Sequence, residues 1–216
     1  YVVFKNILEG NWEGDVYPVN LKHQKVQGRQ CYRYVKDVPK SVDMAIITTP
    51  ARTVVGLIRE CGRAKIGGVV ILSYDFKAYG DLRHTMYHNI AQASRHFNLR
   101  VIGPNSMGLI NPHFQLNAST AKKTALAGKI AFISQSATLA SSILDWSLEQ
   151  NVGFSHFVSI GSMVDIGFGD LIDYFGTDSN TACILLYVQN LTKARQFMSA
   201  ARAFSRSKPI IVLKAG

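Results

Sequence analysis

Short apolar segments alternate along this chain with longer segments whose apolar residues recur at helical spacing. Strands of a parallel sheet are covered on both faces, so they appear as nearly continuous apolar runs. In the first half of the chain such runs occupy residues 41–48, 69–72 and 99–102, and helical patterns over 53–65 and 82–97 separate them. This alternation predicts an α/β fold built on a parallel sheet.

The second half of the chain repeats the pattern after a break. The apolar periodicity lapses over residues 111–128, which we interpret as an interdomain connection. Beyond it, predicted strands at 129–133, 154–159, 183–188 and 209–213 alternate with predicted helices at 138–150, 168–175 and 193–205. We therefore expect a Rossmann-like domain over residues 1–126, which also holds a helix at 2–8 and a strand at 16–20. A flavodoxin-like, doubly wound parallel sheet is expected over residues 127–216.

The composition narrows the class of protein. The 216 residues are 47% hydrophobic and 18% charged, as in a globular protein. No apolar run reaches the roughly 18 residues needed to cross a bilayer, and residues 1–9 lack the features of a signal peptide, so we expect a cytoplasmic location and no membrane partner.

The three cysteines show no CxxC spacing, and His84 and His88 have no evident third ligand, so no metal site is expected. A net charge of +10 suits a polyanionic ligand, but the basic residues form no arginine-rich tract, so nucleic acid is not expected.

Two polar turns follow predicted strands, at the positions where α/β sheets bind ligands. The first, GPNSMG at 103–108, combines a proline, an asparagine and glycines that permit close approach of backbone. The second, ISQSATLA at 133–140, opens a predicted helix with hydroxyl side chains. A helix N-terminus of this kind favours an anion such as phosphate, and the same serines also serve as helix caps. Ser136 lacks the flanking glycines of a GxSxG elbow, so we do not expect it to be a nucleophile.

Five segments of the chain resemble sequence motifs of one known family. They are the two turns and the segments VYPVNLK at 16–22, VDMAIITTPA at 42–51 and SKPIIVLKAG at 207–216. The family is that of the NDP-forming acyl-CoA synthetases related to the succinyl-CoA synthetase α subunit, and the resemblance covers nearly the whole chain. It implies a CoA-binding domain followed by the first flavodoxin-like ligase domain, with an opening strand and a glycine-rich loop expected ahead of residue 1. ILDW at 143–146 and the residues 194–202 are more similar to the synthetase-like half of Pat-type protein lysine acetyltransferases.

The resemblance implies a CoA site at the strand ends of the first domain. The residues that match CoA-contacting positions of the family are Pro18, Asn20, Lys22, Thr48, Thr49, Pro50, Ser73, Tyr74, Asn105 and Ser106. Lys22 is expected to pair with a phosphate, and the surroundings of Pro50 and Tyr74 are expected to hold the adenine or the pantetheine. From its residue type alone, each of these would be an ordinary turn residue.

The resemblance also implies a phosphate site at a helix N-terminus. It comprises Ser134, Gln135, Ser136, Ala137 and Thr138 and is expected to face a phosphorylated histidine. That histidine is expected beyond Gly216, and no histidine in the chain matches its motif, so we expect no catalytic residue in these 216 residues. Two positions depart from the family: Gln189 stands in place of the glutamate that partners the histidine, and Ala137 stands where glycine is common. A neutral amide bonds an imidazole but does not balance its positive charge.

Two functions from different classes follow. The first is a CoA- or acyl-CoA-binding part of an ADP-forming acyl-CoA ligase of the acetate–CoA ligase type, whose ATP or ADP with Mg²⁺ binds an ATP-grasp domain outside this sequence. The alternative is a non-catalytic acyl-CoA-sensing module that regulates a GNAT-type lysine acetyltransferase domain. A weaker third reading, a nicotinamide-binding domain, would need a glycine fingerprint with an acidic residue about 20 positions on. Association into a homo-oligomer is left open.

Overall fold

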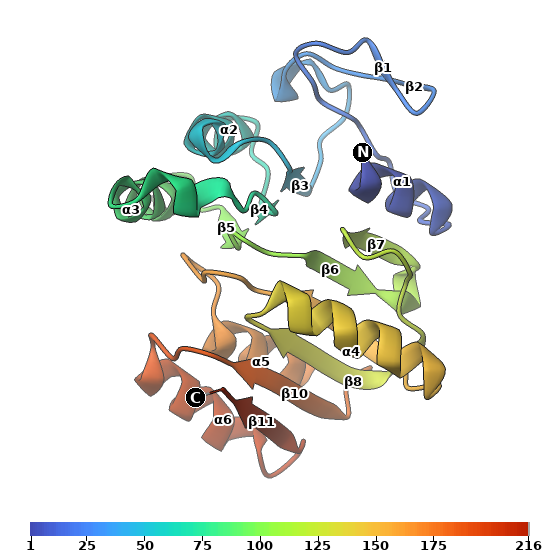
Figure 1. The fold of residues 1–216 in the computed structure, drawn as a ribbon, viewed down its shortest axis with the longest axis vertical. Coiled ribbons are helices and arrows are strands. Elements are labelled where there is room, and N and C mark those ends of the chain that lie inside the picture. The colour runs from blue at the N-terminus through green and yellow to red at the C-terminus, as the bar shows by residue number, and fades with distance from the viewer. Residues whose placement is uncertain (216) are drawn as a thin grey trace.

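The computed structural model describes residues 1–215 and contains two larger sheets, a three-stranded parallel sheet and a six-stranded mixed sheet, one above the other in Figure 1. Gly216, the last residue of the motif at 207–216, lies outside the described residues. No helix within residues 1–215 is both long enough and apolar enough to cross a membrane. The predicted α/β class is confirmed, and parallel strands form all of the first sheet and the part of the second that spans β8 to β11, residues 127–214.

The first sheet has three parallel strands in the order β3-β4-β5. They are β3 (Met44–Ile47), β4 (Gly68–Ile71) and β5 (Arg100–Ile102), and the helices that cover them are α1 (Val2–Glu9), α2 (Ala51–Arg63) and α3 (Leu82–His96). In β4, Val69 and Ile71 belong to the core under α2 and α3, whereas Val70 belongs to a cluster with Val3 and Ile7 of α1. Alternate residues of β4 thus enter two cores, which explains its continuous apolar sequence. Figure 1 shows α2 and α3 together and α1 apart from them.

The segment between α1 and β3 has little regular structure. It contains the short strands β1 (Lys25–Val26) and β2 (Arg29–Gln30) and the 3-10 helix η1 (Val35–Asp37). The strand predicted at 16–20 does not form, and Val19 makes one isolated bridge with Tyr32. Pro18 in the middle of this segment has no N–H to donate, which limits any ladder there.

The second sheet has the order β11-β10-β8-β9-β6-β7. Its parallel strands are β8 (Ala127–Ser134), β9 (Phe154–Ser159), β10 (Cys183–Val188) and β11 (Ile210–Lys214), and its helices are α4 (Ala137–Glu149), α5 (Phe168–Thr177) and α6 (Ala194–Phe204). The core under α4 includes Phe132, Leu144 and Phe157, and a separate core lies under α5 and α6. The strand order of the parallel part is that of a flavodoxin-like sheet.

The prediction that residues 111–128 form an interdomain connection is wrong in part, because some of these residues form a hairpin of the second sheet. β6 (Gly108–Asn111) and β7 (Leu116–Ser119) are antiparallel, are joined by the 3-10 helix η3 (Pro112–Phe114), and pair with β9 through β6. Each strand has four residues, too few for a period of two to stand out in the sequence. Asn111 accepts a hydrogen bond from the Phe114 amide at 3.3 Å and caps η3, which turns the chain.

Candidate functional site

The carboxyl ends of β3, β4 and β5 lie side by side. Ile47 pairs with Ile71, and Val70 pairs with Ile102, so the loops that follow the three strands emerge at one edge of the sheet. Six of the predicted CoA contacts follow directly on these strands and are brought together at this edge: Thr48, Thr49, Pro50, Ser73, Tyr74 and Asn105. The edge of an open α/β sheet is where such folds bind ligands.

Ser73 links the three loops of this edge. Its hydroxyl donates a hydrogen bond of 2.5 Å to the carbonyl oxygen of Thr49, and its own carbonyl oxygen accepts the amide of Asn105 at 2.9 Å. Ser73 is buried, so its side chain serves the protein rather than a ligand. We infer that it holds the loops at a fixed spacing.

Thr48, Pro50, Tyr74 and Asn105 are exposed at this edge, and among them Tyr74 offers an aromatic ring and Asn105 an amide. Tyr74 is 77% exposed, so its ring offers an uncovered apolar face. Asn105 is exposed, has a left-handed backbone with φ of 58°, and its side chain makes no hydrogen bond within residues 1–215. An aromatic face beside an unused amide suits a ligand that combines a ring with polar groups.

The N-terminus of α2 at this edge already holds an anion. Both carboxylate oxygens of Asp75 accept the amide of Ala51, at 2.9 and 3.2 Å. Ala51 is the first residue of α2, so this carboxylate occupies the amide that would otherwise meet a phosphate. Asp75 is not among the predicted site residues, because its distance of 24 residues from Ala51 gives no local signal.

Pro18, Asn20 and Lys22 lie in a separate loop, between α1 and β1. The Pro18 carbonyl oxygen accepts the Tyr32 amide, and the Asn20 amide donates to the Tyr32 carbonyl oxygen, both at 2.9 Å. The Asn20 side chain accepts the Lys22 amide at 2.8 Å and shapes the turn. No hydrogen bond within the described chain joins these three residues to the strand-end edge.

This loop continues into a basic segment, residues 22–40. Its basic residues are Lys22, Lys25, Arg29, Arg33, Lys36 and Lys40, against the single carboxylate of Asp37. Lys40 is paired with Asp15 at 2.7 Å, whereas Lys22 has no ion-pair partner within residues 1–215. The side chain of Lys22 is therefore available to an anionic ligand.

The predicted phosphate site lies at the start of α4, beyond the carboxyl end of β8. Ser136 is the N-cap and accepts the Leu139 amide at 3.2 Å, while the buried Ser134 hydroxyl donates to the Ser136 carbonyl oxygen at 2.9 Å and accepts the Ser136 amide at 3.1 Å. The amides of Ala137 and Thr138 have no partner within residues 1–215. The two serines hold the turn, which leaves these first-turn amides for an anion.

Gln135 and Gln189 connect this turn to β10. The side-chain oxygen of Gln135 accepts the amides of Gln189 and Asn190, at 2.6 and 2.8 Å. The side chain of Gln189 is exposed at the end of β10. The structure thus places the predicted histidine partner beside the predicted phosphate site, with Gln135 as the link between them.

Ser106 does not lie with the open residues of the strand-end edge. Its hydroxyl is buried and donates a hydrogen bond of 2.5 Å to the Ser159 carbonyl oxygen at the end of β9. The Ser159 hydroxyl in turn accepts the Met107 amide at 3.0 Å. The hydroxyl of Ser106 therefore ties the 103–108 turn to the second sheet.

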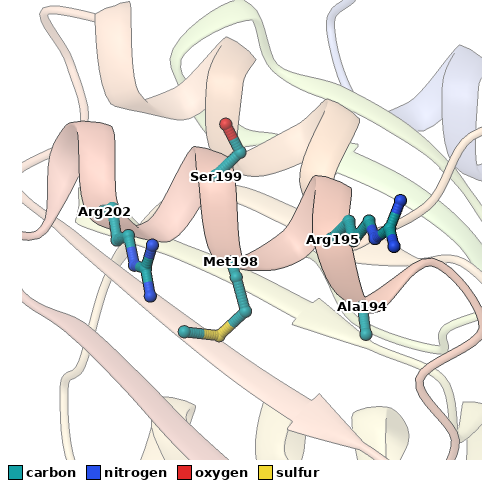
Figure 2. Close-up of a pocket in the computed structure, with 5 residues that line it drawn as sticks. All are labelled: Ala194, Arg195, Met198, Ser199 and Arg202. Atoms are coloured by element: carbon teal, nitrogen blue, oxygen red, sulfur yellow. The ribbon is translucent and has the colours of Figure 1, made fainter.

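An open depression lies elsewhere, along α6. Figure 2 shows the residues that line it, which are Ala194, Arg195, Met198, Ser199 and Arg202, and its volume is about 470 Å³. All five come from one helix, and none belongs to the predicted sites. Within the described chain, no three His, Cys, Asp or Glu side chains are grouped to hold a metal ion.

The comparisons with known proteins agree with this geometry. Residues 1–112 match the model of a CoA binding domain, and residues 127–216 match that of the succinyl-CoA ligase like flavodoxin domain. The α subunit of acetate–CoA ligase [ADP-forming] II from Pyrococcus furiosus is 38% identical over 216 residues, which are 100% of this chain and 47% of that protein. The acetate–CoA ligase [ADP-forming] of Methanocaldococcus jannaschii is also 38% identical, over 100% of this chain and 30% of its own length.

A solved structure extends the likeness to the fold. It is described as dinucleotide forming acetyl-coenzyme A synthetase 1 of Ca. Korarchaeum cryptofilum in complex with phosphate and ADP. Its TM-score is 0.94 at 35% identity, and the match covers 99% of this chain and 46% of that one. The chain thus spans about half the length of the α subunit and of the solved chain, and less of the longer ligase.

Proposed function

Because the chain belongs to the CoA binding domain family, we propose that the edge formed by β3, β4 and β5 binds CoA or acyl-CoA within an ADP-forming acyl-CoA ligase. The observation that carries the proposal is the convergence of Thr49, Ser73 and Asn105 through hydrogen bonds at one strand-end edge. Tyr74 supplies the face against which the adenine or pantetheine packs, and Asn105 supplies an amide for a polar group of the ligand.

The distribution of charged side chains supports one orientation of the ligand. The Asp75 carboxylate occupies the first amide of α2, so the phosphates of CoA lie away from this helix. The basic segment 22–40 attracts them, with Lys22 as the direct partner. The neutral part of the ligand then lies over Pro50 and Tyr74.

In the complete ligase we propose that α4 receives a phosphoryl group. Phosphate displaces CoA from the acyl-CoA to give an acyl phosphate. A histidine beyond Gly216 takes the phosphoryl group and releases the free carboxylate, and ADP then takes the phosphoryl group to give ATP and the free histidine. The amides of Ala137 and Thr138 stabilise the phosphoryl charge, and Gln189 hydrogen-bonds the imidazole. An ATP-grasp part, in the same polypeptide or in a partner subunit, binds the nucleotide with Mg²⁺. This chain alone supplies binding rather than turnover.

The acetyltransferase-regulating alternative is not favoured, because the relatives named above are ligases. The domain limits of 1–126 and 127–216, the cytoplasmic location and a homo-oligomeric state stay predictions. Labelling of the complete protein by γ-labelled ATP tests the ligase step directly. Acid-labile, base-stable phosphate that disappears when the downstream histidine is replaced is the expected result; its absence from a protein that still binds acetyl-CoA contradicts the ligase assignment.

Calorimetric titration of CoA tests the binding site. We expect the wild-type chain to bind and Tyr74→Ala to bind roughly tenfold more weakly, since stacking on an aromatic ring is worth about 1–3 kcal/mol. Tyr174→Ala is the matched control, because Tyr174 is also 60% exposed but lies on α5. Equal weakening in both variants would place the ligand elsewhere.

A further inference from the structure

The segment 160–167, between β9 and α5, contacts both candidate sites. The Ile160 amide donates to the Ser134 carbonyl oxygen at 2.8 Å, next to the start of α4. The Ser162 amide donates to the Pro104 carbonyl oxygen at 2.8 Å, next to Asn105. A single residue, Gly161, therefore separates a contact with one site from a contact with the other.

Met163 contacts the candidate phosphate site at the start of α4. Its sulfur accepts a hydrogen bond from the side-chain nitrogen of Gln135 at 3.7 Å. The oxygen of the same amide is fully used by Gln189 and Asn190, which identifies the nitrogen as the atom that faces Met163. Met163 has a left-handed backbone with φ of 51°, so the chain bends sharply at this contact.

The rest of the segment is fastened to the first sheet. The Val164 amide donates to the Gly103 carbonyl oxygen at 3.2 Å and the Ile166 amide to the Val101 carbonyl oxygen at 3.1 Å, an antiparallel pattern along the end of β5. The hydroxyls of Ser162 and Tyr87 of α3 lie 3.1 Å apart. These bonds leave the segment little freedom to move relative to β5.

Gly161 is the tightest point of this arrangement. Its φ is 56°, and a Cβ at this position would lie 2.1 Å from the Pro104 carbonyl oxygen and 2.6 Å from that of Asn105. Both contacts are with backbone, which cannot swing away as a side chain can. Any residue other than glycine must therefore push the 103–106 turn off its present position.

We infer that Gly161, Ser162 and Met163 form a positioning joint that fixes the CoA-binding edge relative to the start of α4. The inference rests on the proposed function, because it gives the joint the task of placing the thioester of the bound acyl-CoA within reach of the phosphate. Neither Gly161 nor Met163 is assigned a contact with substrate. Gly161 and Met163 instead set the distance between the CoA-binding edge and the start of α4, and other residues form these two sites.

Two variants of the complete ligase test the joint. Met163→Gly removes the contact with Gln135, adds no atom and suits the left-handed backbone; we expect turnover to fall by roughly 10²-fold, the scale of a 1 Å misplacement, with little change in the CoA dissociation constant. Gly161→Ala displaces the turn that carries Asn105; we expect a similar loss of turnover together with about tenfold weaker CoA binding, or about 1.4 kcal/mol.

Gly80→Ala is the control. Gly80 also has a positive φ, of 52°, but a Cβ there meets nothing within 4 Å. If both test variants turn over like Gly80→Ala, the joint has no positioning role. If the wild-type ligase itself binds no CoA, the proposed function fails instead, and the two failures are thereby distinguished. Met163→Gly keeps the inference testable even where Gly161→Ala does not fold.

Discussion

The carboxylate of Asp75 shows how one residue sets the polarity of a site. By accepting the Ala51 amide with both oxygens it caps α2, which has no side-chain cap of its own from Pro50. In the proposed CoA complex the same negative charge would keep a phosphate from this helix end, although a helix N-terminus at a strand-end edge is otherwise a common phosphate site. Asp75 thus stabilises the helix, and we propose that it also orients the ligand.

Replacement of Asp75 separates these two effects. We expect Asp75→Ala to lower the free energy of unfolding by about 0.5–2 kcal/mol, the usual worth of a helix cap, as measured by urea denaturation. Asp75→Asn keeps an acceptor for the Ala51 amide and is the control, with a smaller loss. A stability of Asp75→Ala equal to that of the wild type would contradict the capping role.

At the scale of single elements, α4 depends on its first turn. Ser136 caps the helix, and Ser134 fixes the approach of the chain through two hydrogen bonds. Without this cap the amides of Ala137 and Thr138 would lose their fixed direction. The geometry of the proposed anion site therefore depends on the helix cap.

Ser136→Ala should accordingly lower the free energy of unfolding by about 0.5–2 kcal/mol. Ser141→Ala is matched to it, because Ser141 is an exposed residue inside the same helix, where alanine has the better helix propensity. Chemical denaturation of both variants checks this. The capping role is refuted if the two substitutions have the same effect.

His156 connects the hairpin, β9 and the end of α5. Its Nε2 lies 2.9 Å from the Asn111 side-chain nitrogen and so acts as the acceptor, which places the ring proton on Nδ1. Nδ1 lies 3.7 Å from a carboxylate oxygen of Asp178 and has no hydrogen-bond partner in the described chain. Burial lowers the pKa of His156; Asp178 opposes this shift, and His113 adds to it.

This lowered pKa predicts a loss of stability in mild acid. The unfolded chain takes up the proton near the ordinary pKa of about 6.5, before the folded chain does, so the free energy of unfolding falls as the pH drops below that value. His156→Gln keeps an acceptor for Asn111 and should flatten this decline by up to about 1.4 kcal/mol per pH unit. Urea denaturation between about pH 7.5 and 5.5 measures it, and an unchanged slope would show that His156 is not responsible.

At the scale of the whole molecule, the two sheets are joined by ion pairs as well as by the backbone. Arg100 of β5 donates to Asp165 and to Asp170, each at 3.0 Å. Asp165 also accepts the amide of Val101, a fully buried residue, at 2.8 Å. The Asp165 carboxylate therefore forms an ion pair and also accepts a backbone amide, whereas the Arg100 side chain is about half exposed and forms ion pairs only.

The two residues should differ when replaced. Asp165→Ala leaves the Val101 amide without its partner, and we expect a loss of about 1–3 kcal/mol in the free energy of unfolding. Arg100→Ala removes two partly exposed ion pairs, each worth about 0–1 kcal/mol. Asp165→Asn, which keeps an acceptor for Val101, should recover most of the loss. Scanning calorimetry is the measurement, and equal effects of the two alanine variants would argue against a special role for Asp165.

Much of this architecture could be predicted from the sequence, because buried strands and amphipathic helices have strong periodic signals. The helices α1 to α6 form close to their predicted positions, as do the strands β8 to β11. The hairpin of β6 and β7 could not be predicted in this way. Its strands are short, and their pairing with β9 joins residues about 50 positions apart, which no local pattern records.

The candidate site was predictable to the extent that it lies at strand ends. Parallel strands bring their carboxyl ends to one edge, so the strand pattern predicts that the loops after these strands lie together, whereas the choice of Thr49, Ser73 and Asn105 rests on the family resemblance. The partners of buried polar groups could not be predicted. Ser106 bonds to Ser159, Asp75 to Ala51, and Gly161 touches Pro104, and each of these contacts depends on tertiary packing between distant segments.

The central claim is that CoA binds at the edge formed by β3, β4 and β5, and backbone amide NMR of the labelled chain during a titration with CoA tests it most directly. We expect chemical-shift changes concentrated at the amides of residues 48, 49, 73–75 and 105, with a second group around Lys22. Changes confined to the α6 depression of Figure 2, or none at saturating CoA, would contradict it.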